Sequence, residues 1–322
     1  MNKLNFNNYI IISLICLFIF SCSSTQLLDI SKDDELDLLI ESLEGTKLKI
    51  KTNEDVKKLL IKSLIKLNSD ISISFVDTPD NETINISNNF LDQKFAYFCK
   101  SPHSYLDEIT KEYLFSTVEI DEVFIFYSRK FLSRAEIISN NYPGAKIFLI
   151  ESDYDSIVKD VFELKDSYSR SDLINKLVKE EDINFIPRPR KDFKRIFIIA
   201  DYDQSKNFIP SLKFNYILDR EIISSAQSIL KIEDRRKLLD FSDIVVTVPN
   251  SFMKDKNYSN LDELSKLSFL NDLIIISAMK KKNLSSQNIN GRFANIRYVQ
   301  NSCSDMSMDV VKINDLGDFS LL

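Results

Sequence analysis

The sequence predicts an α/β protein with mainly parallel sheets and helices on both faces. Short apolar runs, such as residues 122–127 (EVFIFY) and 195–200 (RIFIIA), are typical of strands buried on both sides. Between these runs, apolar residues recur three and four positions apart, which is the spacing of amphipathic helices. The alternation of strand and helix indicates βαβ units. It yields more strands than one sheet needs, so we expect two α/β lobes.

The first half of the chain shows this alternation of strands and helices. Apolar or alternating runs predict strands at residues 46–51, 71–76, 94–98, 122–127 and 146–150. Helical spacing of apolar residues predicts helices at 54–67, 105–115, 131–140, 156–164 and 171–180. Ser104 is expected to cap the helix at 105–115, because a serine hydroxyl accepts free N–H groups of a first turn. The polar stretch 79–89 is expected to be a loop.

The second half continues in the same way. Strands are expected at 195–200, 221–225 and 243–248. Helices are expected at 204–216, with a kink at Pro210, and at 261–279, with a break at Asn271 and Asp272. The tail, residues 292–322, is expected to form short strands with turns at Asn314 and Gly317.

Composition excludes several classes of function. The chain has 322 residues, a net charge of -6 and scattered basic residues, so it can bury a full core and shows no basic surface for nucleic acid. Its four glycines lie too far apart for a phosphate-binding loop. Its single histidine rules out zinc motifs with two histidines. We therefore expect no cofactor, no metal site and no nucleic-acid partner.

The N-terminal residues predict export and lipidation. Lys3 supplies a positive charge, and residues 9–20 (YIIISLICLFIF) match the apolar core of a signal peptide, being too short to span a bilayer comfortably. Ile19-Phe20-Ser21-Cys22 then resembles a lipobox, in which the Cys22 thiol takes a diacylglycerol. Acyl chains on Cys22, palmitate among them, would hold the protein on a membrane. An ordinary secretory signal or an anchor helix, with Cys22 incidental, is the alternative.

The residues after the lipobox favour the outer membrane. Ser23 and Ser24 follow Cys22, and bacteria that sort lipoproteins by the next residue retain those with Asp there in the inner membrane. The mature chain would then lie in an oxidising compartment. There Cys99 and Cys303 could form a disulfide or remain two buried thiols, and their spacing does not decide between the two.

A basic segment is the first candidate for function. Arg188, Arg190 and Lys191 in residues 184–192 (NFIPRPRKD) could contact an acidic partner, because guanidinium groups pair with carboxylates. The alternative is an extended crossing segment with solvated charges.

Two further candidates are weaker. His103 could act as a general base, but the sequence offers no Gly-x-Ser-x-Gly elbow, and a role in a cap or loop is the alternative. Asp201 and Asp203 follow a strand and could bind a cation, but acidic residues also favour helix N-termini.

Residues 183–225 resemble the C-terminal domain of the LppC lipoprotein family, the LpoA-type activators of penicillin-binding proteins. The shared pattern is a Pro- and Arg-rich segment followed by Asp, then an apolar strand ending in Ala. A helix with the pattern Pro-x-Leu-x-Phe-x-Tyr comes next, here Pro210, Leu212, Phe214 and Tyr216. The tail, residues 292–322, looks like the closing strands of the family.

The resemblance implies a type 1 periplasmic-binding-protein-like fold, with two α/β lobes joined by three crossings. Together with the lipobox, it divides the chain into a signal peptide (1–21), a lipidated tether (22–44) and an LppC-like periplasmic domain (45–322). Lobe 1 would comprise about 45–117 and 222–290, and lobe 2 about 118–221 and 291–322. The resemblance also implies an outer-membrane lipoprotein without catalysis of its own. It would bind a class A penicillin-binding protein, a peptidoglycan synthase, and stimulate its transpeptidase.

The sequence departs from the family pattern in three places. The family's helical-repeat domain is absent, residues 78–91 are shorter than an extra strand–helix unit of the family, and residues 51–53 lack a ligand-holding loop of small residues. The leading hypothesis is a regulator of cell-wall synthesis, and hence of cell shape, that acts through protein contacts. The second is a solute-binding lipoprotein that holds a small polar ligand between its lobes. The third is a hydrolase that uses His103 or the carboxylates.

Overall fold

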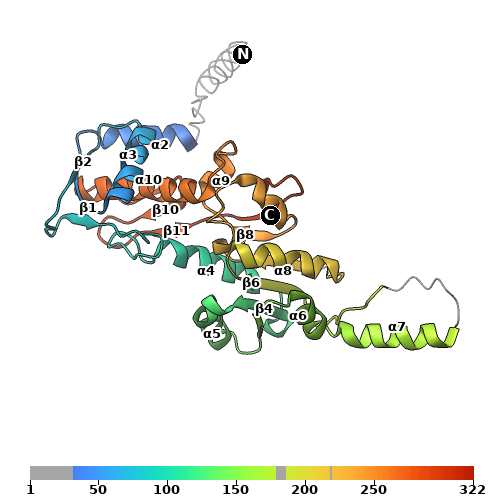
Figure 1. Cartoon of the computed structure of the whole chain (residues 1–322). Coiled ribbons are helices and arrows are strands. Elements are labelled where there is room, and N and C mark those ends of the chain that lie inside the picture. Colours follow the sequence, from blue (N-terminus) through green and yellow to red (C-terminus); the bar gives the residue numbers. More distant parts are fainter. Residues whose placement is uncertain (1–31, 179–185, 218–219) are drawn as a thin grey trace, which may run out of the picture. The chain divides into compact units, whose positions relative to one another are not determined.

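A computed structural model describes residues 32–178, 186–217 and 220–322 (Figure 1). The predicted signal peptide and Cys22 lie outside these residues. By its internal contacts the chain divides into Met1–Leu39 and a compact unit, Ile40–Leu322, with helix α2 (Lys32–Ser42) crossing the boundary. Among the described residues, no helix has both the length and the apolar character needed to cross a bilayer.

A seven-stranded sheet is the largest element. Its strands, in spatial order, are β13 (Phe319–Leu321), β12 (Val310–Ile313), β8 (Val245–Thr247), β7 (Glu221–Ser224), β6 (Arg195–Ile199), β4 (Val123–Ser128) and β5 (Lys146–Ile150). Strands β4 to β8 are parallel, whereas β12 and β13 pair antiparallel at one edge. Every residue of β6 is buried, as the apolar run predicts.

Helices cover both faces of this sheet. Helices α4 (Pro102–Phe115) and α5 (Leu132–Asn141) pack on one face, where Val123 and Ile125 point. Helices α6 (Tyr154–Val161) and α8 (Tyr202–Phe214) cover the other, where the ring of Phe126 lies 4.9 Å from that of Phe208. Short 3-10 helices lie in the connections: η1 (Ile120–Glu122) before β4, η2 (Arg129–Phe131) after it, η3 (Ala226–Ser228) after β7 and η4 (Arg235–Phe241) before β8.

A smaller half surrounds helix α10 (Leu261–Lys281). It contains β1 (Lys47–Lys51), α3 (Glu54–Leu67), β2 (Ser72–Phe75), β3 (Thr83–Asn85), α9 (Asn250–Lys254), β9 (Gln287–Asn290), β10 (Asn295–Tyr298) and β11 (Asp305–Ser307). Strands β2-β1-β3 form a parallel sheet and β11-β10-β9 an antiparallel one. Almost all of α10 is buried, because α3, β1 and aromatic rings around Phe269 pack on its different sides.

The α/β class with mainly parallel sheets and helices on both faces is confirmed, with one difference in the smaller half. There β1 buries Leu48 and Ile50 but leaves Lys47 and Lys51 exposed. That sheet therefore has one covered and one solvated face. The strands also divide the chain differently from the expected lobes. Strands β7 and β8 fall in the range expected for lobe 1, yet they pair with β6 in the large sheet.

Four local expectations are wrong. Helix α4 begins at Pro102, and its cap is Ser101, whose hydroxyl accepts the backbone N–H of Ser104. Residues 94–98 form turns with one isolated bridge, between Phe98 and Ser304, because their aromatic rings pack on α10 instead of pairing as a strand. The polar stretch 79–89 contains β3. Helix α10 is continuous through Asn271 and Asp272.

Asp272 explains why α10 needs no break at that point. Its carboxylate is fully buried and accepts the backbone N–H groups of Arg292, Phe293 and Ala294 at 2.8, 2.9 and 3.2 Å. The turn before them needs Gly291, because a Cβ at that position would collide with the Asp272 carboxylate. Burial raises the pKa of Asp272 to about 7, although the three N–H groups act in the opposite direction.

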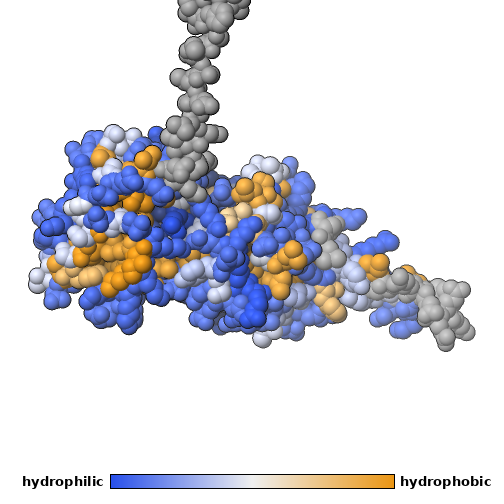
Figure 2. All heavy atoms as spheres, turned by 90° about the horizontal axis from the view of Figure 1, so that it is seen from above, coloured by the Kyte–Doolittle hydropathy of each residue, from blue (hydrophilic) through white to orange (hydrophobic). Residues whose placement is uncertain are grey.

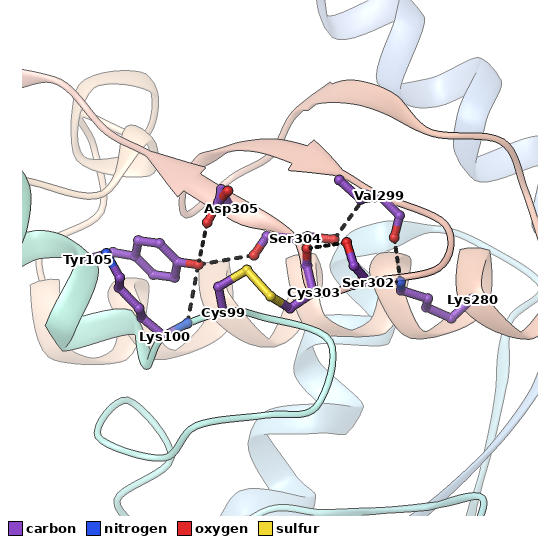
Figure 3. The surroundings of a disulfide bond; sticks show 9 residues. All are labelled: Cys99, Lys100, Tyr105, Lys280, Val299, Ser302, Cys303, Ser304 and Asp305. Atoms are coloured by element: carbon purple, nitrogen blue, oxygen red, sulfur yellow. Dashed lines mark hydrogen bonds between the residues drawn. A yellow bond between two sulfur atoms is a disulfide. The ribbon is translucent and has the colours of Figure 1, made fainter.

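Cys99 and Cys303 form a disulfide, which decides the alternative that the sequence left open (Figure 3). The bond joins residues 204 positions apart in the sequence. Backbone hydrogen bonds run beside it, from Cys99 N–H to the carbonyl of Ser304 and from Ser304 N–H to that of Tyr97. The Lys280 ammonium donates to the carbonyls of Val299, Gln300 and Ser302 on the same loop. The tail is thus held to α10 and to the segment before α4.

Helix α7 (Leu164–Val178) continues from α6. Beyond Ser171 its described side chains are exposed, and they include three large apolar ones, Leu173, Ile174 and Leu177. In Figure 2 a small hydrophobic patch is visible at this end of the molecule, and larger hydrophobic patches lie elsewhere on the same face.

We predict that loss of the disulfide destabilises the fold. Cys99→Ser with Cys303→Ser should lower the free energy of unfolding by about 2–5 kcal/mol, because the bond closes a long loop and so restricts the unfolded chain. Urea denaturation of the oxidised protein and of the double variant measures this. Adding a reductant should weaken the wild type only, and equal unfolding midpoints would contradict the prediction.

We also predict a pH-dependent contribution from Asp272. Its pKa is raised in the folded state, so the folded protein keeps a proton that the unfolded chain loses. This contribution is fully present below the ordinary pKa of 3.8 and is lost as the pH rises to about 7. Stability measured from pH 4 to 7 should therefore fall more steeply in the wild type than in Asp272→Asn. The exposed control Asp70→Asn should follow the wild type, and parallel curves for all three would refute this assignment.

Candidate functional site

A cavity of about 330 Å³ opens at the carboxyl edge of the seven-stranded sheet. One wall is formed by residues that follow parallel strands: Lys130 and Phe131 after β4, Asp201 after β6 and Gln227 after β7. The other wall comes from the smaller half, with Asn88, Phe90, Asp92, Asp262 and Lys266 among its members, and His103 of α4 adjoins it. Ligands of parallel α/β sheets bind at this edge, where the loops after the strands diverge.

Local structure fixes the residues of the sheet-side wall. Asp201 is the N-cap of α8 and accepts the backbone N–H of Gln204, so its carboxylate stays at the end of β6. Lys130 lies in the 3-10 turn after β4, with its ammonium 5.4 Å from the centre of the Phe131 ring. These two side chains face each other with 3.9 Å between Nζ and Oδ2.

Most charges in the cavity are already paired. Lys266 bonds Asp262 at 2.6 Å on the same face of α10. Arg134 on α5 pairs with Asp107 on α4. Lys231 differs from these, because no close ion pair joins it to a described residue, although its charge adds to the larger effect of His103 in lowering the pKa of Asp92. An anionic group of a ligand could therefore pair with the Lys231 ammonium.

Asp107 lies where a second cavity, of about 370 Å³, adjoins the first. The two cavities share Asp92, His103, Arg134 and Gln227 as lining residues. Burial raises the pKa of Asp107, and the neighbouring Arg134 guanidinium counteracts that rise.

His103 has a structural partner. Its Nδ1 lies 2.6 Å from Asp92, and this hydrogen bond holds the pKa of that carboxyl below its ordinary value. The nearby hydroxyls of Ser101 and Ser104 bond each other at 2.7 Å. Within the described parts of the chain, no hydroxyl or thiol bonds the imidazole, so the observed contacts assemble no nucleophile with it. The arrangement can bind a polar molecule through charges of both signs and the rings of Phe90 and Phe131.

The basic segment lies elsewhere. It leads into the amino end of β6, whereas the cavity is at the carboxyl end. Arg190 is engaged internally, with Asp192 at 2.5 Å, Glu163 at 3.1 Å and the Phe124 ring beneath its guanidinium. Arg188 and Lys191 are exposed. Of the three predicted contact residues, Arg190 is therefore held in ion pairs within the fold, whereas Arg188 and Lys191 are open to solvent.

The two aspartates after β6 are also separated by the structure. Asp201 lines the cavity and caps α8, whereas Asp203 is exposed and pairs with Lys206 at 2.7 Å. No group of three or more potential metal ligands lies together in the described ranges.

Sequence reasoning missed the other cavity residues. Lys130 could have been found, because it follows a buried strand as Asp201 does. Arg134 and Lys231 carried no such signal, since they reach the cavity from a helix and a loop whose packing the sequence does not show.

No family model matches the sequence, and no curated protein matches it. Among solved structures it is similar to the LpoA C-domain from Haemophilus influenzae, described as a regulator of PBP1A, with 7% identity, a TM-score of 0.45 and 86% and 82% of the two chains covered. It is also similar to an ABC transporter substrate-binding protein from Sphaerobacter thermophilus, with 10% identity and a TM-score of 0.47, over 86% of this chain and 96% of that one. A leucine-binding protein from Thermotoga maritima is similar with 11% identity and a TM-score of 0.43, over 86% of this chain and 97% of that one. These likenesses concern the fold alone and carry no argument about activity.

Proposed function

We propose that this chain is a lipid-anchored protein on the periplasmic side of the outer membrane that regulates peptidoglycan synthesis by binding a class A penicillin-binding protein. One observation carries the proposal: the segment that resembles the LppC family presents its distinctive side chains to solvent. Arg188 and Lys191 are exposed before β6, and Phe214 and Tyr216 are 75% and 46% exposed at the end of α8. Arginine and aromatic side chains on a surface are typical of protein interfaces.

The backbone at Tyr216 forms the end of helix α8. Tyr216 has a φ of +60°, a conformation that favours glycine and is uncommon for a bulky residue. The aromatic ring is nevertheless present there, and it is exposed. The positive φ belongs to the end of the helix, because the N–H of Tyr216 donates to the carbonyl of Lys213 and that of Ile217 to the carbonyl of Leu212. Support for a partner comes only from the exposure of the ring.

The disulfide supports a location outside the cytoplasm. Disulfides persist in oxidising compartments such as the periplasm and are rare where thiols are kept reduced. The bond between Cys99 and Cys303 therefore agrees with the export signal in the sequence. The lipobox at Cys22 supplies the anchor in this proposal.

The direct prediction concerns the synthase. The purified protein should bind a class A penicillin-binding protein and raise the fraction of crosslinked peptides that the synthase makes from lipid-linked precursor. Binding is measured by biolayer interferometry and crosslinking by chromatography of digested product. A Cys22→Ser variant, purified without an acyl chain, serves as the control for effects of the anchor. If neither binding nor crosslinking changes, the proposed function is wrong.

A second candidate function, binding of a small solute, is favoured by the cavity and by Lys231. A ligand with a carboxylate should raise the melting temperature, since a ligand at a hundredfold its dissociation constant adds about 2.7 kcal/mol of stability. Thermal shift against amino acids and muropeptides tests this. Lys231→Ala should abolish the shift, whereas Lys256→Ala, an exposed lysine outside the cavity, should retain it. Absence of any shift in the wild type removes this candidate.

A further inference from the structure

The outer part of α7 carries apolar side chains that the fold does not bury. Near its start, Leu164, Ser167 and Ser171 are buried. Farther along, Leu173, Ile174 and Leu177 are 60%, 49% and 82% exposed. Positions three and four apart share one side of a helix, so Leu177 lies beside both Leu173 and Ile174.

The return segment adds a fourth apolar side chain. The backbone N–H of Arg190 donates to the carbonyl of Phe162, and that of Arg188 donates to the Ser167 hydroxyl at 3.0 Å. The segment therefore runs antiparallel along α7. Because an extended chain advances about 3.3 Å per residue and a helix about 1.5 Å, Ile186 lies about one turn beyond Ser167. Ile186 is 57% exposed. We call Leu173, Ile174, Leu177 and Ile186 the apolar ridge.

The apolar ridge is not explained by the stability of the chain itself. A helix of about 12–15 residues is marginal in water without tertiary packing, and single exposed leucines are ordinary, but a cluster of four large side chains marks an interaction surface. A partner that covers the ridge would also stabilise the outer turns of α7.

Charges beside the ridge indicate the kind of partner. Arg188 and Lys191 are exposed, and neither forms an ion pair with any residue that the structure describes. Arg190, between them, is neutralised by Asp192 and Glu163. Helix α7 itself carries cations and carboxylates interspersed and so offers no basic face to an anionic lipid surface. These exposed cations are complementary to carboxylates on a partner.

We propose that the apolar ridge inserts into an apolar groove of the peptidoglycan synthase, and that Arg188 and Lys191 meet carboxylates on the rim of that groove. This inference rests on the proposed function and names the surface through which it operates. The mode is that of a helix in a groove, where residues three and four apart anchor the contact.

The test compares two leucines that are equally exposed. The full chain, purified in detergent, is measured against a full-length class A penicillin-binding protein by biolayer interferometry. Leu177→Asp should weaken binding about 10–30-fold, because loss of a central apolar anchor is an effect of that size. Leu316→Asp changes a side chain that is 80% exposed at a turn in the tail, and it should bind like the wild type. Arg188→Glu with Lys191→Glu should weaken binding about tenfold at low salt and less at high salt.

The outcomes separate this inference from the proposed function. If the wild type binds the synthase and Leu177→Asp binds equally well, the ridge is not the interface, while the proposed function stands. If Phe214→Ser alone weakens binding, the interface lies at the end of α8. If the wild type does not bind at all, both proposals fall. Loss of self-association or of vesicle binding in Leu177→Asp, with synthase binding unchanged, would assign the ridge to another occupant.

The fold of the variants is checked by circular dichroism and melting temperature, which should match the wild type because the side chains are exposed. If Leu177→Asp unfolds α7, Ile186→Asp replaces it as the test of synthase binding, because Ile186 is an exposed residue outside that helix.

Discussion

The smaller half of this protein depends on one constraint: helix α10 is apolar on almost every side. Such a helix is stable in water only where other elements cover its whole circumference. Helix α3 and strand β1 come from the start of the chain, and Phe293 comes from its last part, so both are brought to the same helix. Asp272 is the charged residue among the few polar ones that α10 buries. It is satisfied by three backbone N–H groups, which fixes the turn between β9 and β10 and thereby the path of the tail.

The path of the tail has consequences for the large sheet and for the cavity. The disulfide and Lys280 hold the loop after β10, and the chain then enters the seven-stranded sheet as β12 beside β8. The smaller half therefore cannot separate freely from the large sheet on the side of α4. The cavity between α10 and the carboxyl edge of the sheet lies where the two halves meet without a continuous apolar contact. Its walls combine the apolar side chains of Phe90, Phe131 and Leu230 with charged side chains, most of which are paired with each other.

Patterns of apolar residues correctly predicted the helices and strands whose buried residues recur at a regular spacing. Strands β4 and β6 and helix α3 have the expected extents to within one or two residues, because burial on both faces or on one stripe leaves a period in the sequence. The failures have a different cause. Residues 94–98 look like a strand, but Phe95 and Phe98 are buried as rings against α10 without a ladder. The expected break at Asn271 and Asp272 failed because groups distant in sequence hydrogen-bond to both side chains: the Ser63 hydroxyl donates to the Asn271 amide oxygen, and three backbone N–H groups donate to Asp272. The cavity was missed for the same reason, since Arg134 and Lys231 become neighbours only through the arrangement of the halves.

The distribution of unpaired charge is the strongest physical guide to function. In the cavity, Lys130, Arg134 and Lys266 each have a carboxylate partner, so only Lys231 is available without breaking a contact. At the amino edge of the sheet, Arg188 and Lys191 are exposed and can pair with a partner's carboxylates without breaking an existing ion pair. They lie beside apolar side chains that nothing in the described chain covers. Breaking a partly buried ion pair to admit a ligand is unfavourable, whereas pairing an exposed cation and burying exposed leucines is favourable. A partner with a large complementary surface therefore gains more at the amino edge than a small solute gains in the cavity.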